Sequence, residues 1–144
     1  MSEDIDVLIP KLTKKEFGKL YEEFLSKNFW SINSELLEDN YALLIDNHAI
    51  RMTRKEWVIP NIEIRYIADE IDKLTFKSRI KVILPVGTLE VSPPEIQIAY
   101  KRHVLGSEKD FEDAIHLEEI FKDKIDEHLL KTFEELLQRE YPKK

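Results

Sequence analysis

The sequence predicts an α+β fold, in which a small mixed β-sheet with a flanking helix precedes a C-terminal helical hairpin. Short apolar or alternating segments are concentrated before residue 92, and helical periodicity dominates after it. The chain has 144 residues, of which 42% are hydrophobic and 35% charged, which is typical of one ordinary domain. We therefore expect a single domain over 1–144, with a sheet-rich part at 1–91 and a helical part at 92–144.

The sheet-rich part is predicted to begin with a strand over Ile5–Ile9, which Pro10 ends. Thr13 and Glu16 have the spacing of a capping box, so a helix is expected from there to about Asn28. The remaining elements are shorter. Strands are predicted over residues 29–32, 41–45, 48–53, 61–66, 79–84 and 88–91, with a helical turn over 35–38 and a short helix over 67–74.

Two of these strand pairs are predicted to be hairpins. Residues 41–45 and 48–53 flank a turn at Asp46-Asn47, and residues 79–84 and 88–91 flank Pro85-Val86-Gly87. Both assignments depend on turn residues that separate two apolar runs.

The helical part is predicted to contain three helices. The first has Ser92 as its cap and Pro93 at its first position, and Gly106 ends it. The second begins at residues 107–110 and the third continues to Tyr141. Their inward side chains are predicted to be Ile96, Ala99, Tyr100, His103 and Val104, then Phe111, Ala114, Ile115, Leu117 and Phe121, then Leu129, Leu130, Phe133, Leu136, Leu137 and Tyr141.

Composition excludes several functions. The absence of cysteine excludes disulfides and thiolate zinc sites, and three glycines are too few for a phosphate-cradling loop. A net charge of −7 makes the chain a poor binder of duplex DNA, so we expect no nucleic-acid partner. No apolar run approaches the roughly 18 residues of a membrane span, so we expect no membrane association and a cytoplasmic location.

Two acidic segments are candidates for metal chemistry. On a strand, Asp4 and Asp6 point to one face with Cα atoms roughly 6.6 Å apart, while Ile5 and Val7 face the core. Glu63 lies between two apolar residues of another strand and could join them as a third carboxylate if the strands are neighbours. Such oxygen ligands suit Mg²⁺. The alternative is that all three side chains are ordinary solvated surface residues.

Basic residues form the second group of candidates. Lys101 lies beside an apolar helical stripe, and Lys109 stands four residues before Asp113, so a simple ion pair is the alternative for Lys109. The segment 51–57 combines cations with Trp57 and could hold a polyphosphate or stack on a base, although a solvated loop has the same composition.

Taken together, these segments resemble the polymerase-β-type nucleotidyltransferase superfamily, in particular its small prokaryotic minimal and AbiEii-like members. Residues 2–9 look like the metal-binding strand of that family, and 61–64 like the strand of its third carboxylate. Residues 89–101 and the Lys-Asp-x-x-Asp-Ala segment at 109–114 look like the hairpin and helices that follow, and Ile125-Asp126 also fits. The family's Gly-Ser turn has no counterpart before Asp4, so we expect an N-terminally truncated version of the fold.

The resemblance implies a role for each matching residue. Asp4, Asp6 and Glu63 would bind Mg²⁺, and Lys101 and Lys109 would lie near a bound nucleoside triphosphate (NTP). The implied reaction is transfer of a nucleotidyl group to an unknown acceptor, in a module of the toxin–antitoxin type. The alternative is an inactive relative that binds nucleotides or proteins. A protein partner or a homodimer is compatible with both.

Overall fold

The chain has an α+β fold, and its computed structural model describes residues 4–57 and 60–143. It divides into two compact units, Met1–Ala68 and Asp69–Lys144. The hairpin over residues 80–91, which was predicted as the end of the sheet-rich part, belongs to the second of these units.

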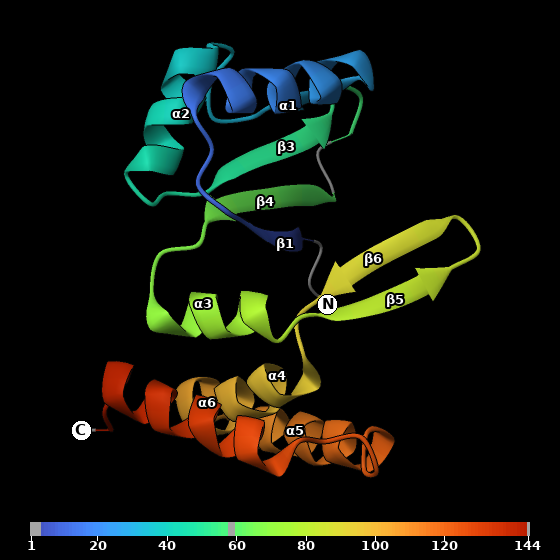
Figure 1. Cartoon of the computed structure of the whole chain (residues 1–144), viewed down its shortest axis with the longest axis vertical. Coiled ribbons are helices and arrows are strands. Elements are labelled where there is room, and N and C mark those ends of the chain that lie inside the picture. Colours follow the sequence, from blue (N-terminus) through green and yellow to red (C-terminus); the bar gives the residue numbers. More distant parts are fainter. Residues whose placement is uncertain (1–3, 58–59, 144) are drawn as a thin grey trace. The chain divides into compact units, whose positions relative to one another are not determined.

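The first unit is a mixed sheet with two helices on one face (Figure 1). The strand order is β1-β4-β3-β2; β1 runs parallel to β4, whereas the other pairs are antiparallel. The elements are β1 (Asp4–Ile9), α1 (Lys14–Ser26), β2 (Phe29–Ser31), α2 (Leu37–Ile45), β3 (Ile50–Arg54) and β4 (Asn61–Tyr66).

The core of this unit lies between the sheet and the helices. Side chains from α1 and α2 pack on the inward side chains of β3 and β4, and Val7 and Ile9 of β1 pack against them. The buried members are Phe17, Tyr21, Leu44, Ile50, Met52, Ile64 and Tyr66.

The start of α1 confirms the predicted capping box. The backbone N–H of Glu16 donates to Thr13 Oγ1 over 3.2 Å, and that of Thr13 donates to Glu16 Oε1 over 2.9 Å. The second of these bonds holds the pKa of Glu16 below its ordinary value. The helix ends as expected, because Asn28 adopts a left-handed φ of 67°.

The predicted strand over residues 41–45 is wrong, because this segment belongs to helix α2. Its apolar run is short enough to suit either element. The helical spacing buries Asn40 and Leu44, one turn apart, against the rest of the unit. The predicted hairpin partner does form strand β3, but β3 pairs with β2 and β4 instead.

The second unit is a group of packed helices with a separate two-stranded hairpin (Figure 1). Its core is built by α4, α5 and α6, and the buried members are Ile96, Ile98, Ala99, Ala114, Leu130, Phe133 and Leu137. The elements are α3 (Glu70–Lys77), β5 (Ile80–Leu84), β6 (Gly87–Val91), α4 (Pro94–Tyr100), the π-helix η1 (Lys101–Leu105), α5 (Glu108–Ile120) and α6 (Glu127–Glu140).

Three details of this unit differ from the sequence expectations. Helix α3 begins later than predicted, at a capping box formed by Asp69 and Asp72. Ser92 does not cap α4; the cap position is Pro93, and the buried Glu95 side chain accepts a hydrogen bond from the backbone of Asp126. Four side chains that were predicted to face inward are exposed: Tyr100, Phe111, Ile115 and Tyr141.

A charged cluster joins η1 to the neighbouring helices. Arg102 forms ion pairs with Glu118 and with Glu134, the second over 3.2 Å, and His103 Nε2 lies 3.2 Å from Glu134 Oε2. Gly106 ends η1 with a left-handed φ of 64°, as its predicted role requires. Within the described part of the chain, every helix is too short or too polar to cross a lipid bilayer.

Candidate functional site

Two of the predicted site residues lie on β1, on the face that points away from the core. Val7 and Ile9 pack against the core from the opposite side of the strand, so the alternation turns Asp4 and Asp6 outward. The expectation for Val7 is thus confirmed, whereas Ile5, at the beginning of the strand, is 54% exposed.

Strand β4 brings Glu63 beside this pair. In the parallel register of β1 and β4, Asp6 is the partner of Glu63, and Asp4 is the partner of Asn61. Neighbouring strands lie about 4.8 Å apart, and partners in register point to the same face. Asp6 and Glu63 are therefore neighbours on the face of the sheet that points away from the core, and Asp4 follows two residues along the same face.

Strand β3 adds a cation that the sequence analysis did not connect with Glu63. Arg51 is the antiparallel partner of Glu63, and its Nε donates to Glu63 Oε1 over 3.2 Å. The side chain of Glu63 is 25% exposed and that of Arg51 51% exposed. Asn61 Nδ2 also lies 3.4 Å from Asp4 Oδ1. We call Asp4, Asp6, Arg51, Asn61 and Glu63 the open polar face of the sheet.

The donor chemistry of this face suits a hard divalent cation, because carboxylate and amide oxygens are the ligands that Mg²⁺ prefers. The side-chain arrangement is less suited. Nowhere in the described residues do three or more acidic or histidine side chains form a group that could hold a metal ion. Oε1 of Glu63 already accepts from Arg51. A cation would require Glu63 to move from Arg51 toward Asp6.

The two lysines assigned to nucleotide contact belong to the second unit. Lys101 Nζ lies 3.4 Å from Asp113 Oδ2, so Asp113 pairs with Lys101. The helical spacing had instead suggested an ion pair between Asp113 and Lys109. Lys109 is exposed in the first turn of α5 and has no ion pair with any described residue. Their contact with a nucleotide stays a prediction.

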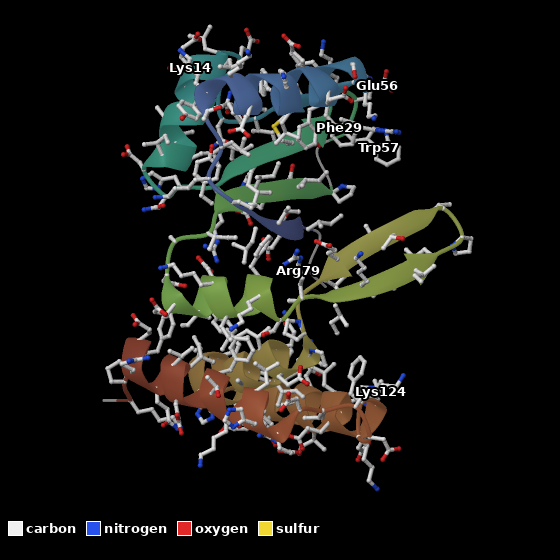
Figure 2. All side chains as sticks on the ribbon, viewed as in Figure 1. Lys14, Phe29, Glu56, Trp57, Arg79 and Lys124 are labelled. Atoms are coloured by element: carbon white, nitrogen blue, oxygen red, sulfur yellow. The ribbon has the colours of Figure 1, made fainter. Side chains whose placement is uncertain are left out.

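The basic segment 51–57 is divided between two environments. Arg51 belongs to the open polar face, whereas Arg54 lies over the rings of Phe29 and Trp57, with its Cζ 5.7 Å and 5.9 Å from the two centroids. Figure 2 shows Phe29 and Trp57 near each other in the first unit. Trp57 remains 54% exposed.

Comparison of the chain with models of known protein families found no match, and comparison with curated proteins found none either.

Two residues of the open polar face, Arg51 and Asn61, were not predicted from the sequence to lie beside Asp4, Asp6 and Glu63. Asn61 stands directly before the apolar alternation of β4 and could have been found as the partner of Asp4 only with the parallel register known. Arg51 was noted for its charge, but its link to Glu63 depends on the antiparallel register of β3 and β4. Sequence patterns give the face that each residue occupies, but not which strands are neighbours.

Proposed function

We propose that the chain is a nucleotidyltransferase-like protein that transfers a nucleotidyl group from an NTP to an acceptor hydroxyl, with the open polar face as its acidic site. The observation that carries this proposal is the parallel register that sets Asp6 beside Glu63, with Asp4 on the same face. Glu63 is also the residue that the alternation of its strand predicts as a third carboxylate.

The residues of the open polar face have distinct parts in this proposal. Mg²⁺, when bound, neutralises charge on the triphosphate and orients it for in-line displacement. Asp4, Asp6 and Glu63 would hold the cation, and Glu63 would also accept the proton of the attacking hydroxyl. The new bond joins the acceptor oxygen to the α-phosphorus, the bond from the α-phosphorus to its bridging oxygen breaks, and pyrophosphate leaves.

A second candidate is an inactive relative that binds a nucleotide or a protein. The ion pair between Arg51 and Glu63 favours it, because a carboxylate held by a guanidinium is less available to a cation or to a hydroxyl proton. Both candidate functions are compatible with the same fold, so only a measurement of catalytic activity distinguishes them.

Thermal unfolding with and without ligand tests nucleotide binding. Each of the four NTPs is added with MgCl₂, and binding at a hundredfold excess over Kd should stabilise the protein by about 2.7 kcal/mol. The Asp6→Asn/Glu63→Gln double variant should lose this shift. Asp46→Asn, which removes an exposed carboxylate beyond the end of α2, is the matched control and should keep it.

Release of pyrophosphate from the bound NTP, with α-phosphate label appearing in an acceptor, separates the two candidates. Label transfer that the double variant abolishes supports the transferase. A thermal shift without pyrophosphate release, with water or with cell extract as the source of acceptor, would support the inactive relative. No shift with any NTP would exclude nucleotide binding by either.

A further inference from the structure

The first unit has a pocket beside β2, the strand at one edge of its sheet. The pocket has a volume of about 510 Å³, within the range of roughly 300–1,000 Å³ that is typical of small-molecule sites. None of its lining residues belongs to the open polar face. The lining comes from α1, from β2 and from the segments that follow β2 and β3: Tyr21, Leu25, Trp30, Ser31, Glu35 and Lys55.

Part of the lining is apolar and aromatic. Leu25 is 46% exposed near the end of α1, so its side chain is accessible to a ligand. Tyr21 lies one turn earlier on the same face of the helix, and its buried ring packs on that of Phe17 with 5.8 Å between the centroids. The indole of Trp30 is partly buried. These side chains form walls that suit an aliphatic or aromatic group.

Two charges of opposite sign line the same pocket without pairing. The carboxylate of Glu35 and the ammonium of Lys55 have no ion pair or hydrogen bond with any described residue. The hydroxyl of Tyr21 donates to the carbonyl oxygen of Glu35 over 3.4 Å. Burial first, and then the charge of Glu35, raise the pKa of Tyr21, so its hydroxyl stays neutral beside that carboxylate. A ligand can therefore lie between one anionic and one cationic group.

The indole N–H of Trp30 is a further polar group without a partner. Its Nε1 is buried and has no acceptor among the described residues. Unpaired buried donors are costly and rare, so such a group needs an explanation. The other polar side chain of β2 is already used, because the Ser31 hydroxyl donates to Asn40 Oδ1 over 2.5 Å. The lining thus has two unused donors, at Trp30 and Lys55, and one unused carboxylate.

We propose that this pocket binds a free α-amino acid with an apolar side chain. The carboxylate of the ligand pairs with Lys55 Nζ. It also accepts from Trp30 Nε1 once the indole ring turns toward the ligand, since this nitrogen is otherwise buried. The ligand's ammonium pairs with the carboxylate of Glu35, and its side chain packs against Leu25 and the ring of Tyr21. Each unpaired polar group of the lining then has a partner.

The composition of the lining disfavours other small ligands. A nucleotide or another polyphosphate would need several cations, whereas Lys55 is the one cationic side chain among the described lining residues and Glu35 opposes it. A wholly apolar ligand would leave the indole N–H and both charges unpaired. This proposal goes beyond the proposed function and does not depend on it.

Calorimetric titration of the full chain with L-phenylalanine, L-leucine and L-methionine tests the proposal. At least one of them should bind with a Kd below about 1 mM. Glycine, which lacks the apolar group, should bind at least about tenfold more weakly. The tightest ligand is then compared with its deaminated and decarboxylated analogues, which for L-phenylalanine are hydrocinnamate and phenethylamine. Each analogue loses one charged contact and should bind at least about fivefold more weakly.

Variants of the two charged residues locate the ligand. Lys55→Gln and Glu35→Gln should each raise the Kd of the amino acid by about fivefold, as expected for a contact partly open to solvent. Lys15→Gln and Glu22→Gln are the matched controls, because they make the same changes at exposed positions of α1 outside the pocket lining. They should leave the Kd unchanged. Thermal unfolding without ligand establishes that all four variants fold.

Fluorescence follows the turn of the indole ring. The chain has two tryptophans, so in Trp57→Phe the emission comes from Trp30 alone. This emission should change as the amino acid is added, with the Kd that calorimetry gives. The same titration of Trp57→Phe/Lys55→Gln should be shifted to higher ligand concentration. An emission spectrum that stays constant at saturation would place the ligand away from Trp30 and overturn the proposal.

Three further results would also overturn it. No binding of any of the three amino acids up to about 10 mM would show that the pocket does not take this class of ligand. Equally tight binding of glycine or of either analogue would show that the ligand is not recognised as an apolar zwitterion. An unchanged Kd in Lys55→Gln or in Glu35→Gln would place the ligand elsewhere. None of these results bears on NTP binding, which the thermal shift with NTPs measures separately.

Discussion

Arg51 and Glu63 face each other across β3 and β4, with the Nε of the arginine 3.2 Å from Oε1 of the glutamate. This pair lies on the face that also carries Asp6, the partner of Glu63 on β1. Glu63 thus has two neighbours, a cation that holds it in place and a carboxylate with which it could share a metal ion. The open polar face can bind a divalent cation through Glu63 only if Glu63 leaves its ion pair with Arg51 and turns toward Asp6.

Removal of the arginine should favour the cation. In Arg51→Gln, Glu63 no longer has a competing ion pair, and the affinity for Mg²⁺ or Mn²⁺ should rise about fivefold, since an exposed pair is worth up to about 1 kcal/mol. Calorimetric titration of each variant with MnCl₂ measures this. Arg54→Gln is the control, because Arg54 stacks on aromatic rings and is not an ion-pair partner of Glu63. Equal affinities for the two variants would show that Glu63 takes no part in cation binding.

A buried amide provides a prediction for the first unit. Asn40 is fully buried; it accepts from the Ser31 hydroxyl over 2.5 Å and donates to the carbonyl oxygens of Ser34 and Leu36 over 2.9 Å and 2.8 Å. Asn40→Ala removes these three hydrogen bonds and leaves the buried hydroxyl of Ser31 without its acceptor, so it should lower the free energy of unfolding by about 2 kcal/mol. Urea unfolding followed by circular dichroism measures the loss. Ser26→Ala removes only an exposed hydrogen bond and should change stability by less than about 0.5 kcal/mol.

Local signals in the sequence predicted much of the fold. The Thr13–Glu16 capping box, the alternation of Asn61–Tyr66 and the turn at Gly87 each act over a few residues, and all three appear in the structure. Helix α2 was missed because its start at Leu36 has no side-chain cap and its apolar run is brief. Its burial pattern depends on packing against the sheet, which is a tertiary effect.

For the candidate site, too, local features could be predicted from the sequence, whereas contacts between distant strands could not. Alternation along β1 was enough to place Asp4 and Asp6 on one face. That β4 lies beside β1 in parallel, and that β3 brings Arg51 to Glu63, are pairings between strands far apart in the sequence. Such pairings are set by the cooperative packing of the whole unit, so residue spacing alone does not reveal them.

Acid should weaken the start of α5 in a way that depends on Asp110. The hydroxyl of Ser107 donates to the carboxylate of Asp110, and the Ser107 backbone N–H donates to the same carboxylate over 3.1 Å. These bonds, the hydroxyl bond most of all, hold the pKa of Asp110 below its ordinary value of 3.8. A carboxyl whose pKa is lowered by folding stabilises the folded state above its ordinary value, and this stabilisation is lost as the pH falls through the lower folded value.

Asp110→Asn removes that dependence. The wild-type protein should lose stability more steeply than the variant below about pH 3.8, and their difference should be constant near neutrality. Thermal unfolding at a series of pH values compares them. Glu112→Gln removes a carboxylate of the same helix that has no hydrogen bond to any described residue, and its profile should follow that of the wild type. Parallel profiles for Asp110→Asn and the wild type would show that the hydrogen bonds to Ser107 do not stabilise the ionised carboxyl.

The same chemical change should have opposite effects at Gly106 and Gly18, because backbone conformation decides its sign. Gly106 has a φ of 64°, and a Cβ there would meet no atom within 4 Å, so Gly106→Ala is disfavoured by conformation alone and should destabilise by about 1 kcal/mol. Gly18 lies within α1, where a Cβ would be 3.7 Å from Leu37 Cδ1, an ordinary contact. Gly18→Ala should therefore stabilise by about 0.5–1 kcal/mol. Urea unfolding of both variants measures the two changes; a stabilised Gly106→Ala would mean that the left-handed turn does not persist in solution.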